Sequence, residues 1–216
     1  HPQRGLLVPA MFIELAEDTG LIVPVGWWVI RAVCRHLRTW ADQFGAAARP
    51  VHVNVSAHQI ARADFLPRMR GALDEFGTPP HLLYVELTEG TMMENAESTM
   101  LTLRDLKQLG VGLSIDDFGT GYSSLSYLHR FPTNSVKIDQ SFISQMGPGA
   151  RDASIVRTIV DLAHDLGMQV VAEGVETELQ ASALRGMRCE CGQGFHFSRP
   201  VSLADATQLL KSGKVW

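Results

Sequence analysis

Short apolar segments alternate with longer helical patterns along almost the whole chain, and this alternation limits the fold more than any other feature. Strand-like periodicity or continuous apolar character occurs in six segments: residues 51–56, 83–87, 112–116, 135–139, 169–173 and 194–197. Helical patterns lie between and around these segments: residues 12–17, 25–44, 64–76, 97–109, 123–128, 152–166, 178–184 and 203–210. Repeated strand–helix alternation predicts a parallel sheet covered by helices.

Polar residues stand at or near the carboxyl ends of five of these strands, on the face opposite the aliphatic residues: Asn54, Glu86, Asp116, Lys137 and Glu173. In a closed barrel such ends meet at one mouth, where barrels of this type carry out chemistry. An open doubly wound sheet would gather ligands over a crevice between two strands, and the sequence has no G-x-G-x-x-G or phosphate-binding loop. The sequence therefore predicts an α/β fold of the TIM-type (β/α)8 barrel class, with six of the eight strands visible and two expected upstream.

Two adjacent carboxylates follow the third predicted strand, in the segment I-D-D-F-G-T-G at positions 115–121. Because successive strand side chains point to opposite faces, we expect Asp116 and Asp117 to reach different partners, while Gly119 and Gly121 let the backbone fold over a bound group. Adjacent like charges are costly unless a cation offsets them, and hard divalent cations prefer oxygen ligands. An Asx turn that ends the strand and caps the next helix is the alternative for this motif taken alone.

Charge and cysteine content restrict the partners and the compartment. The net charge is −4 and the pI is near 6.1, so the basic footprint of a protein that binds a nucleic-acid polymer is missing. This charge does not exclude a small anionic ligand that is bound through a metal ion. Cys34, Cys189 and Cys191 form no C-x-x-C pair and are odd in number, which predicts reduced thiols in the cytoplasm. A zinc site at Cys189 and Cys191 would need two further ligands.

The chain is expected to form one domain, residues 1–216, without a membrane segment. Its hydrophobic content of 45% is enough for a large core. The longest apolar run, residues 21–30, is interrupted by Pro24 and Gly26 and falls short of the roughly 20 residues that span a bilayer. The first residue is His1 rather than methionine, and no signal-peptide pattern follows it, so we expect a longer or processed protein.

The order of the motifs resembles the EAL domain family, the bacterial cyclic-di-GMP phosphodiesterases, from residue 2 to about residue 201. The similar segments are L-V-P-A-M-F-I at 7–13, A-E-D-T-G-L-I at 16–22, N-V-S at 54–56, E-L-T-E at 86–89, D-D-F-G-T-G at 116–121, K-I-D at 137–139, E-G-V-E-T at 173–177 and Q-G-F at 193–195. Each segment alone is a weak indicator of the family, whereas all of them in this order form a specific pattern. Phe195 replaces a frequent tyrosine of the family, a minor change at a packing position.

The resemblance implies a site for two ions of Mg²⁺ or Mn²⁺. Asn54 and Glu86 resemble ligands of the first ion, Asp116 a ligand placed to bridge both ions, and Asp117 a ligand of the second. Octahedral cations of this kind accept such oxygen ligands together with water. Two ions close together would stabilise the attacking and leaving oxygens of a phosphodiester and lower the pKa of a bound water.

The resemblance also implies catalytic and supporting residues. Lys137 and Glu173, together with Asp117, would act on the attacking water, with Lys137 also balancing developing negative charge. Glu89 is expected to anchor the loop after Asp117. Gln193 is expected near the metals and the substrate, and Glu176 belongs with them to the substrate and loop group.

Each residue has a structural alternative when it is taken alone. Asn54 could cap the following segment, and Glu86 with Glu89 could form a capping pair in a first helical turn. Lys137 could merely neutralise Asp139, and Glu173 could lie in a solvated turn. His52, on the barrel-facing side, fits a core histidine better than a ligand. Only the joint placement of five polar groups at five strand ends favours the site over these alternatives.

The resemblance implies hydrolysis of cyclic di-GMP to linear pGpG, which would lower this second messenger in bacterial signalling. The Glu-Ala-Leu segment of the family, with a further metal-binding glutamate, belongs upstream of His1, so we expect an N-terminally incomplete domain and make the activity conditional on that glutamate. A catalytically inactive cyclic-di-GMP receptor is the alternative, although an inactive receptor would be free to lose Glu86, Asp116, Asp117 or Glu173. Fusion to other signalling domains, a homodimer and a cytoplasmic domain within a membrane-attached protein also fit the resemblance.

Overall fold

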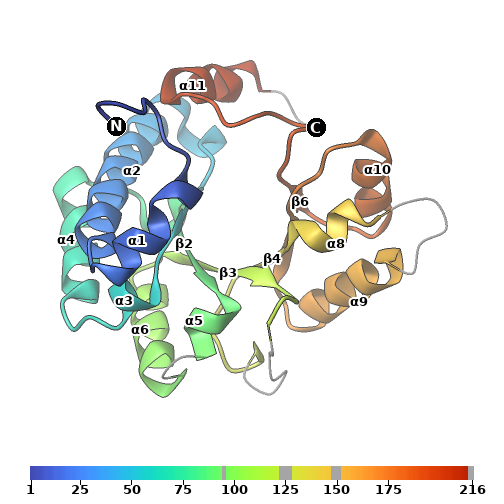
Figure 1. Cartoon of the computed structure of the whole chain (residues 1–216), viewed down its shortest axis with the longest axis horizontal. Coiled ribbons are helices and arrows are strands. Elements are labelled where there is room, and N and C mark those ends of the chain that lie inside the picture. Colours follow the sequence, from blue (N-terminus) through green and yellow to red (C-terminus); the bar gives the residue numbers. More distant parts are fainter. Residues whose placement is uncertain (94–95, 122–127, 147–151, 214–216) are drawn as a thin grey trace.

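Six parallel strands form one curled sheet, and their order in space is their order in sequence (Figure 1). The computed structural model describes residues 1–93, 96–121, 128–146 and 152–213. The strands are β1 (Val51–Asn54), β2 (Leu83–Thr88), β3 (Gly112–Phe118), β4 (Ser135–Ile138), β5 (Gln169–Ala172) and β6 (Cys191–Gly192). This arrangement confirms the predicted barrel class, with six strands in the described part of the chain.

Helices lie around the outside of the curled sheet (Figure 1). The α-helices are α1 (Ile13–Asp18), α2 (Ile22–Phe44), α3 (Ala57–Ile60), α4 (Phe65–Phe76), α5 (Glu89–Met93), α6 (Ala96–Gln108), α8 (Gln140–Ser144), α9 (Asp152–Asp165), α10 (Glu178–Gly186) and α11 (Leu203–Ser212). Among the described residues, three 3-10 turns accompany them: η1 (Pro9–Met11), η2 (Gly45–Ala47) and η3 (Pro80–Leu82). The helix expected at 123–128 falls almost wholly outside the described residues. None of the described helices has the length and apolar character that a bilayer crossing requires.

The two faces of the sheet have opposite character. Val85, Ile115 and Ile138 point outward beneath the helices and are at most 1% exposed. Full burial of one such side chain stabilises the fold by about 1.5–3 kcal/mol. The inner face carries buried polar residues instead: Glu86, Ser114, Asp116, Ser135 and Lys137. The aliphatic side chains on the outer face of the sheet therefore pack against the helices, and the polar side chains on the inner face fill the inside of the half-barrel.

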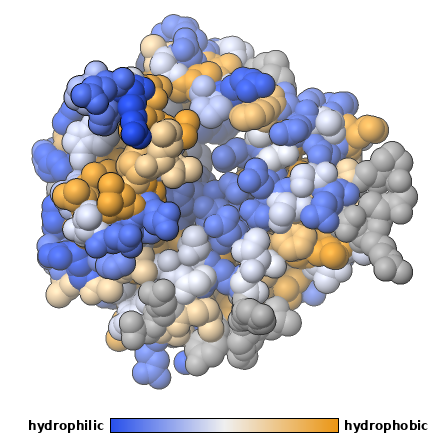
Figure 2. Space-filling view, in the orientation of Figure 1, coloured by the Kyte–Doolittle hydropathy of each residue, from blue (hydrophilic) through white to orange (hydrophobic). Residues whose placement is uncertain are grey.

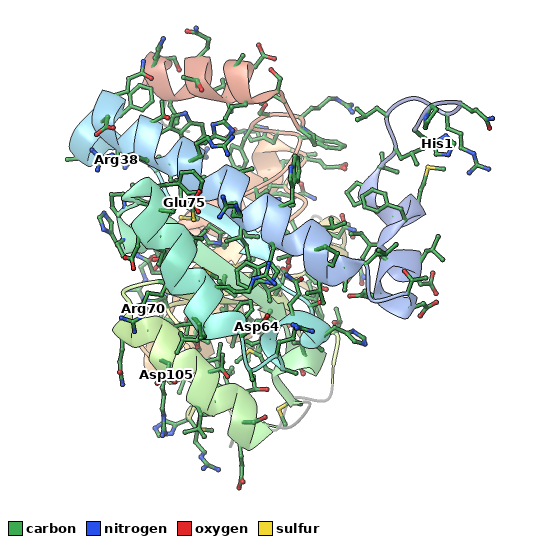
Figure 3. All side chains as sticks on the ribbon, turned by 90° about the vertical axis from the view of Figure 1, so that its left-hand side faces the viewer. His1, Arg38, Asp64, Arg70, Glu75 and Asp105 are labelled. Atoms are coloured by element: carbon green, nitrogen blue, oxygen red, sulfur yellow. The ribbon has the colours of Figure 1, made fainter. Side chains whose placement is uncertain are left out.

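Helices α2, α4 and α6 lie side by side on the outer wall, where Figure 3 labels Arg38, Glu75 and Asp105. Arg31 of α2 pairs with Glu75 of α4 through both terminal guanidinium nitrogens, Nη1 and Nη2. The guanidinium of Arg68 lies 4.4 Å from the ring centroid of Trp27, which adds a cation–π contact between the same two helices. These contacts fix the wall that supports β1 and β2.

Three details of the sequence prediction are wrong. The sixth strand is β6 at 191–192 rather than 194–197, because the amides of Phe197 and Ser198 donate to the carbonyl of Gly194 and close a turn there. The first strand ends at Asn54 rather than residue 56, because Ser56 enters a capping box with Gln59 at the start of α3. The short helices α3, α5 and α8 were not predicted, since four or five residues give too little periodicity to detect.

The sheet has two edge strands, β1 and β6. The helix layer continues across the gap between them, because the indole nitrogen of Trp40 in α2 donates to Thr207 Oγ1 in α11 at 3.1 Å. Beneath this contact lies a cavity of about 670 Å³, lined by residues of both edges such as Val51, His52 and Gly192, and reaching Glu86 and Lys137. The half-barrel is therefore open between its edge strands yet bridged outside them.

Candidate metal and catalytic site

Parallel pairing brings the predicted polar residues to one end of the sheet. Asn54, the last residue of β1, lies opposite Glu86 of β2, and Thr88 of β2 lies opposite Asp116 of β3. Lys137 is on β4, and Glu173 follows β5 directly, with its amide donating to the carbonyl of Ile138. Because side chains on one face of neighbouring parallel strands lie close together, these groups share the mouth of the half-barrel. Figure 2 shows a hollow in this face with hydrophilic residues around it.

Lys137 is the centre of the cluster. Its ammonium lies 2.9 Å from Glu86 Oε2, 3.0 Å from Asp116 Oδ1 and 2.7 Å from Glu173 Oε1, and the residue is 4% exposed. Burial alone lowers the pKa of Lys137, but the carboxylates of Glu173 and Glu86 outweigh it and raise the pKa above its ordinary value. Lys137 is therefore a buried cation held by carboxylates of β2, of β3 and of the residue that follows β5.

The side chains of Asp116 and Asp117 converge, although the alternation of a regular strand would point them to opposite faces. Oxygen atoms of Asp116, Asp117 and Glu173 lie within 4.8 Å of one another. Two features redirect Asp117: its backbone has φ 53°, in the left-handed region, and the pairing of β3 with β4 shifts register between Ile115 and Phe118. A register irregularity of this kind re-aims a side chain, and unusual backbone conformations cluster at functional sites.

The cluster carries more negative than positive charge. Burial is the main reason that the pKa of Glu173 is raised, and the charges of Asp116 and Glu86 add to burial against the opposing effect of Lys137. Burial also raises the pKa of Asp117, followed by the charges of Asp116 and Asp139. Four carboxylates around one ammonium favour a further cation, and oxygen donors are what Mg²⁺ and Mn²⁺ prefer. The donor set fits such ions.

The carboxyl group of Glu86 has a lowered pKa. Burial by itself raises its pKa, yet the hydrogen bond with His52 and the charge of Lys137 outweigh burial and lower the pKa below the ordinary value. The two oxygens have different partners: His52 Nδ1 lies 2.8 Å from Oε1, and Lys137 Nζ lies 2.9 Å from Oε2. Glu86 is thus held ionised at the floor of the site.

Glu89 contacts the loop that follows Asp117. The amide of Gly119 donates to Glu89 Oε2 at 3.2 Å. A Cβ added at Gly121 would lie 2.8 Å from Glu89 Oε1, so only glycine lets this backbone approach the carboxylate. Glu89 is 5% exposed and begins α5. Glu89 therefore contacts the loop after Asp117 through a backbone amide, at the segment where an anchoring contact was expected.

Two predicted residues lie at the margin of the site. Gln193 lines the cavity between the sheet edges, and its backbone joins the loop after β5 by donating to Ala172 and accepting from Val175. Glu176 is exposed, and its backbone amide donates to Gln180 Oε1 at 2.8 Å. Asn54 lines a second cavity, of about 800 Å³, together with Asp116 and Asp117. The described side chains therefore bring Asn54 to the mouth, but not the carboxylate of Glu176.

The structural alternatives do not hold for Lys137 and Glu86. Asp139 does not pair with Lys137 but caps α8, accepting from the amide of Ser141 at 2.9 Å. Glu86 lies inside β2, three residues before α5, and bonds to Lys137 and His52.

Sequence reasoning missed two residues of the site. His52 was expected in the core, yet its side chain is 28% exposed and bonds to Glu86. Gln180 is 7% exposed and holds the loop after Glu173, because its Oε1 accepts from the amides of Glu176 and Thr177 and its Nε2 donates to Ile143. The spacing of Thr177 and Gln180 as a capping box was the available signal for Gln180.

Comparison with known proteins agrees with this architecture. The family model described as EAL domain matches residues 1–200. The chain is 46% identical over 98% of its length to the bifunctional diguanylate cyclase/cyclic di-GMP phosphodiesterase MucR of Pseudomonas aeruginosa, and 44% identical over 98% of its length to the cyclic di-GMP phosphodiesterase NbdA of the same organism. It spans 30% and 27% of these two proteins, so it corresponds to one part of each.

The likeness extends to three dimensions. A solved structure of the PaMucR phosphodiesterase in complex with c-di-GMP has a TM-score of 0.91 and 45% sequence identity, and the match covers 95% of this chain and 83% of that one. A second, the EAL enzyme Bd1971 in its cAMP and cyclic-di-GMP bound form, has a TM-score of 0.92 and 33% identity over 97% of this chain and 57% of that one. With the family model covering nearly the whole chain, this protein belongs to the EAL domain family.

Proposed function

We propose that this domain is a metal-dependent phosphodiesterase that hydrolyses cyclic di-GMP to linear pGpG. The observation that carries the proposal is the convergence of Asp116, Asp117 and Glu173 within 4.8 Å beside the buried ammonium of Lys137. The names of MucR and NbdA, and the complex of PaMucR with c-di-GMP, support the choice of substrate. The alternative of an inactive receptor has no comparable observation in its favour.

The residues that would hold two ions of Mg²⁺ or Mn²⁺ are Asn54, Glu86, Asp116 and Asp117, with Glu173 within reach of the last two. Bound divalent ions supply positive charge to the phosphoryl oxygens and lower the pKa of an attacking water.

The side chains of this domain then transfer the proton, stabilise charge and position the loop. Glu173, whose carboxyl pKa is raised, accepts the proton of the attacking water. Lys137 keeps its charge, because its pKa is raised, and offsets the negative charge that develops on the phosphate. Asp117 contributes a carboxylate at the same point. Glu89 keeps the loop at Gly119 in place, and Gln193, which lines the cavity that reaches Glu86 and Lys137, belongs to the substrate side of the site.

We also propose that further strands complete the sheet. The edge strands β1 and β6 are not paired with each other, and unpaired edges in a barrel are filled by additional strands. Such strands would lie in the cavity of about 670 Å³ that reaches Glu86. A carboxylate on one of them would then stand beside Glu86.

The test follows product formation from cyclic di-GMP by chromatography in the protein that carries this domain. We expect pGpG with Mg²⁺ or Mn²⁺ and none in EDTA, and a loss of about 10²–10⁴-fold in turnover for Glu173→Gln and Asp116→Asn. Asp161→Asn, which makes the same chemical change on an exposed part of α9, is the matched control and keeps full turnover. Full turnover in EDTA would contradict the metal-dependent mechanism. Binding of cyclic di-GMP without turnover would identify a receptor.

A further inference from the structure

His52 holds one oxygen of Glu86, and Lys137 holds the other. His52 Nδ1 lies 2.8 Å from Oε1, while Lys137 Nζ lies 2.9 Å from Oε2. Glu86 is 4% exposed, so the rotation of its carboxylate is set by these two neighbours, one on the adjacent strand β1 and the other on β4, beyond β3.

The sheet register explains why His52 reaches this carboxylate. His52 of β1 lies opposite Tyr84 of β2, and Glu86 is the next residue along β2 on the same face. The imidazole stacks on the ring of Tyr84 with a centroid distance of 4.6 Å and an interplanar angle of 18°. Stacking fixes the plane of the imidazole, and with it the direction in which Nδ1 points.

The chemistry of the pair fixes the position of the hydrogen. An ionised carboxylate only accepts hydrogen bonds, so Nδ1 of His52 carries the hydrogen and donates it to Glu86. A nitrogen that donates its hydrogen in this way cannot at the same time bind a metal. At Nδ1, therefore, His52 supports the carboxylate of Glu86 rather than binding a metal itself.

We propose that His52 is a positioning residue that orients the carboxylate of Glu86 for a divalent cation. The proposal rests on the metal site proposed above. With Nδ1–H on Oε1 and the ammonium on Oε2, each oxygen keeps lone pairs in a fixed direction, and Glu86 loses little rotational freedom when an ion binds. Partners of this kind around a metal ligand typically change metal affinity about 10–100-fold when they are removed.

Three substitutions separate the hydrogen bond from the ring. His52→Ala removes both the donor and the stacking surface. His52→Asn places an amide nitrogen two bonds beyond Cβ, where Nδ1 stands, and so keeps the donor without the ring. His52→Gln places its amide one bond further out, away from that position. His81→Asn is the matched control, because His81 is exposed in η3, just before the amino-terminal end of β2, whereas Glu86 lies toward the carboxyl end of that strand.

The experiment measures Mn²⁺ binding by titration calorimetry and, in parallel, the Mn²⁺ concentration for half-maximal activity. We expect His52→Ala to weaken Mn²⁺ binding about 10–100-fold and to raise the half-maximal concentration by a similar factor, with turnover at saturating Mn²⁺ little changed. His52→Asn should recover most of the affinity, and His52→Gln less. His81→Asn should match the unmodified protein, and denaturant midpoints should show that all four variants are folded.

Two results would overturn the inference alone: Mn²⁺ affinity in His52→Ala equal to that of the unmodified protein, or an equal loss in the alanine, asparagine and glutamine variants. The second result would assign the effect to packing on Tyr84 rather than to the hydrogen bond. An unmodified protein that binds no Mn²⁺ would overturn the proposed metal site and, with it, this role of His52.

Discussion

The ammonium of Lys137 lies 2.7 Å from Glu173 Oε1, on the residue that directly follows the neighbouring strand β5, and this pair completes the cluster of charges inside the half-barrel. The same ammonium contacts Glu86 and Asp116, so one buried cation connects carboxylates from three other segments of chain. Removing one partner of a buried ion pair leaves an uncompensated charge, which costs more than the pair itself contributes. Lys137 is therefore both a structural and a chemical element of the site.

Lys137→Met should destabilise the metal-free protein by about 3–5 kcal/mol, because the buried carboxylates of Glu86 and Asp116 and the half-buried carboxylate of Glu173 lose their cation. Urea unfolding in EDTA measures the change. Adding Mg²⁺ should reduce the difference, since a divalent ion replaces the missing positive charge. Lys107→Met is the control: Lys107 donates to the carbonyl of Pro132 at the exposed surface, and its loss should change stability by less than about 1 kcal/mol. Equal losses in the two variants would contradict the central role of Lys137.

Glu89→Ala should loosen the backbone that follows Asp117. The amide of Gly119 loses its acceptor, so its hydrogen exchange should become faster, and more Mn²⁺ should be needed for half-maximal activity. Exchange measured by mass spectrometry over residues 118–121 tests the first effect. Glu97→Ala, at the start of α6, serves as the control. Unchanged exchange in Glu89→Ala would show that the hydrogen bond does not hold this loop.

Asp117→Asn should raise the stability of the metal-free protein slightly, by up to about 1 kcal/mol, and weaken the binding of metal. Asparagine tolerates the left-handed backbone at φ 53° as aspartate does, so the backbone conformation is kept. The charge that burial and Asp116 oppose is removed, while a carboxylate ligand is lost. Thermal unfolding in EDTA and Mn²⁺ titration should therefore move in opposite directions. A variant that loses stability would show that burial and the charge of Asp116 do not destabilise the ionised side chain of Asp117.

Stability should fall as the pH rises above about 9 because of Cys34. Burial raises the pKa of this thiol to about 11 from 9.0. Between these values the folded state keeps the proton that the unfolded state releases, so this thiol lowers the free energy of unfolding with rising pH, by at most about 1.4 kcal/mol per unit, and its contribution levels off above the folded pKa. Urea unfolding between pH 8 and pH 11 measures the slope. Cys34→Ala should show a shallower slope, and parallel curves for the two proteins would contradict the assignment.

The strands and long helices were predictable because their signals are local. The aliphatic alternation in β2 and β3 located both strands to within two residues, and the apolar spacing of α2, α4 and α9 located those helices. Errors arose where a contact distant in sequence or a single polar bond decides the backbone. The turn that replaces a strand at 194–197 and the capping box at Ser56 are two such cases.

Within the site, the sequence identified the residues but not their partners. It placed Glu86, Asp116, Lys137 and Glu173 at the ends of separate strands, and parallel pairing brought those ends together as expected. It assigned Asp116 and Asp117 to opposite directions, because two-residue alternation assumes regular strand dihedrals. The left-handed backbone at Asp117 and the register shift beside it depend on the pairing of β3 with β4, which a local pattern does not contain.

The sequence by itself determined the fold class, the family resemblance and the polar residues of the mouth, because periodicity and the order of motifs are properties of the chain alone. Only the tertiary structure decided that Lys137 is shared among Glu86, Asp116 and Glu173, that Asp117 turns inward, and that His52 bonds to Glu86. The physical reason is distance: charge and hydrogen-bond energies fall steeply over a few ångström, so the chemistry of these side chains is set by how neighbouring strands align.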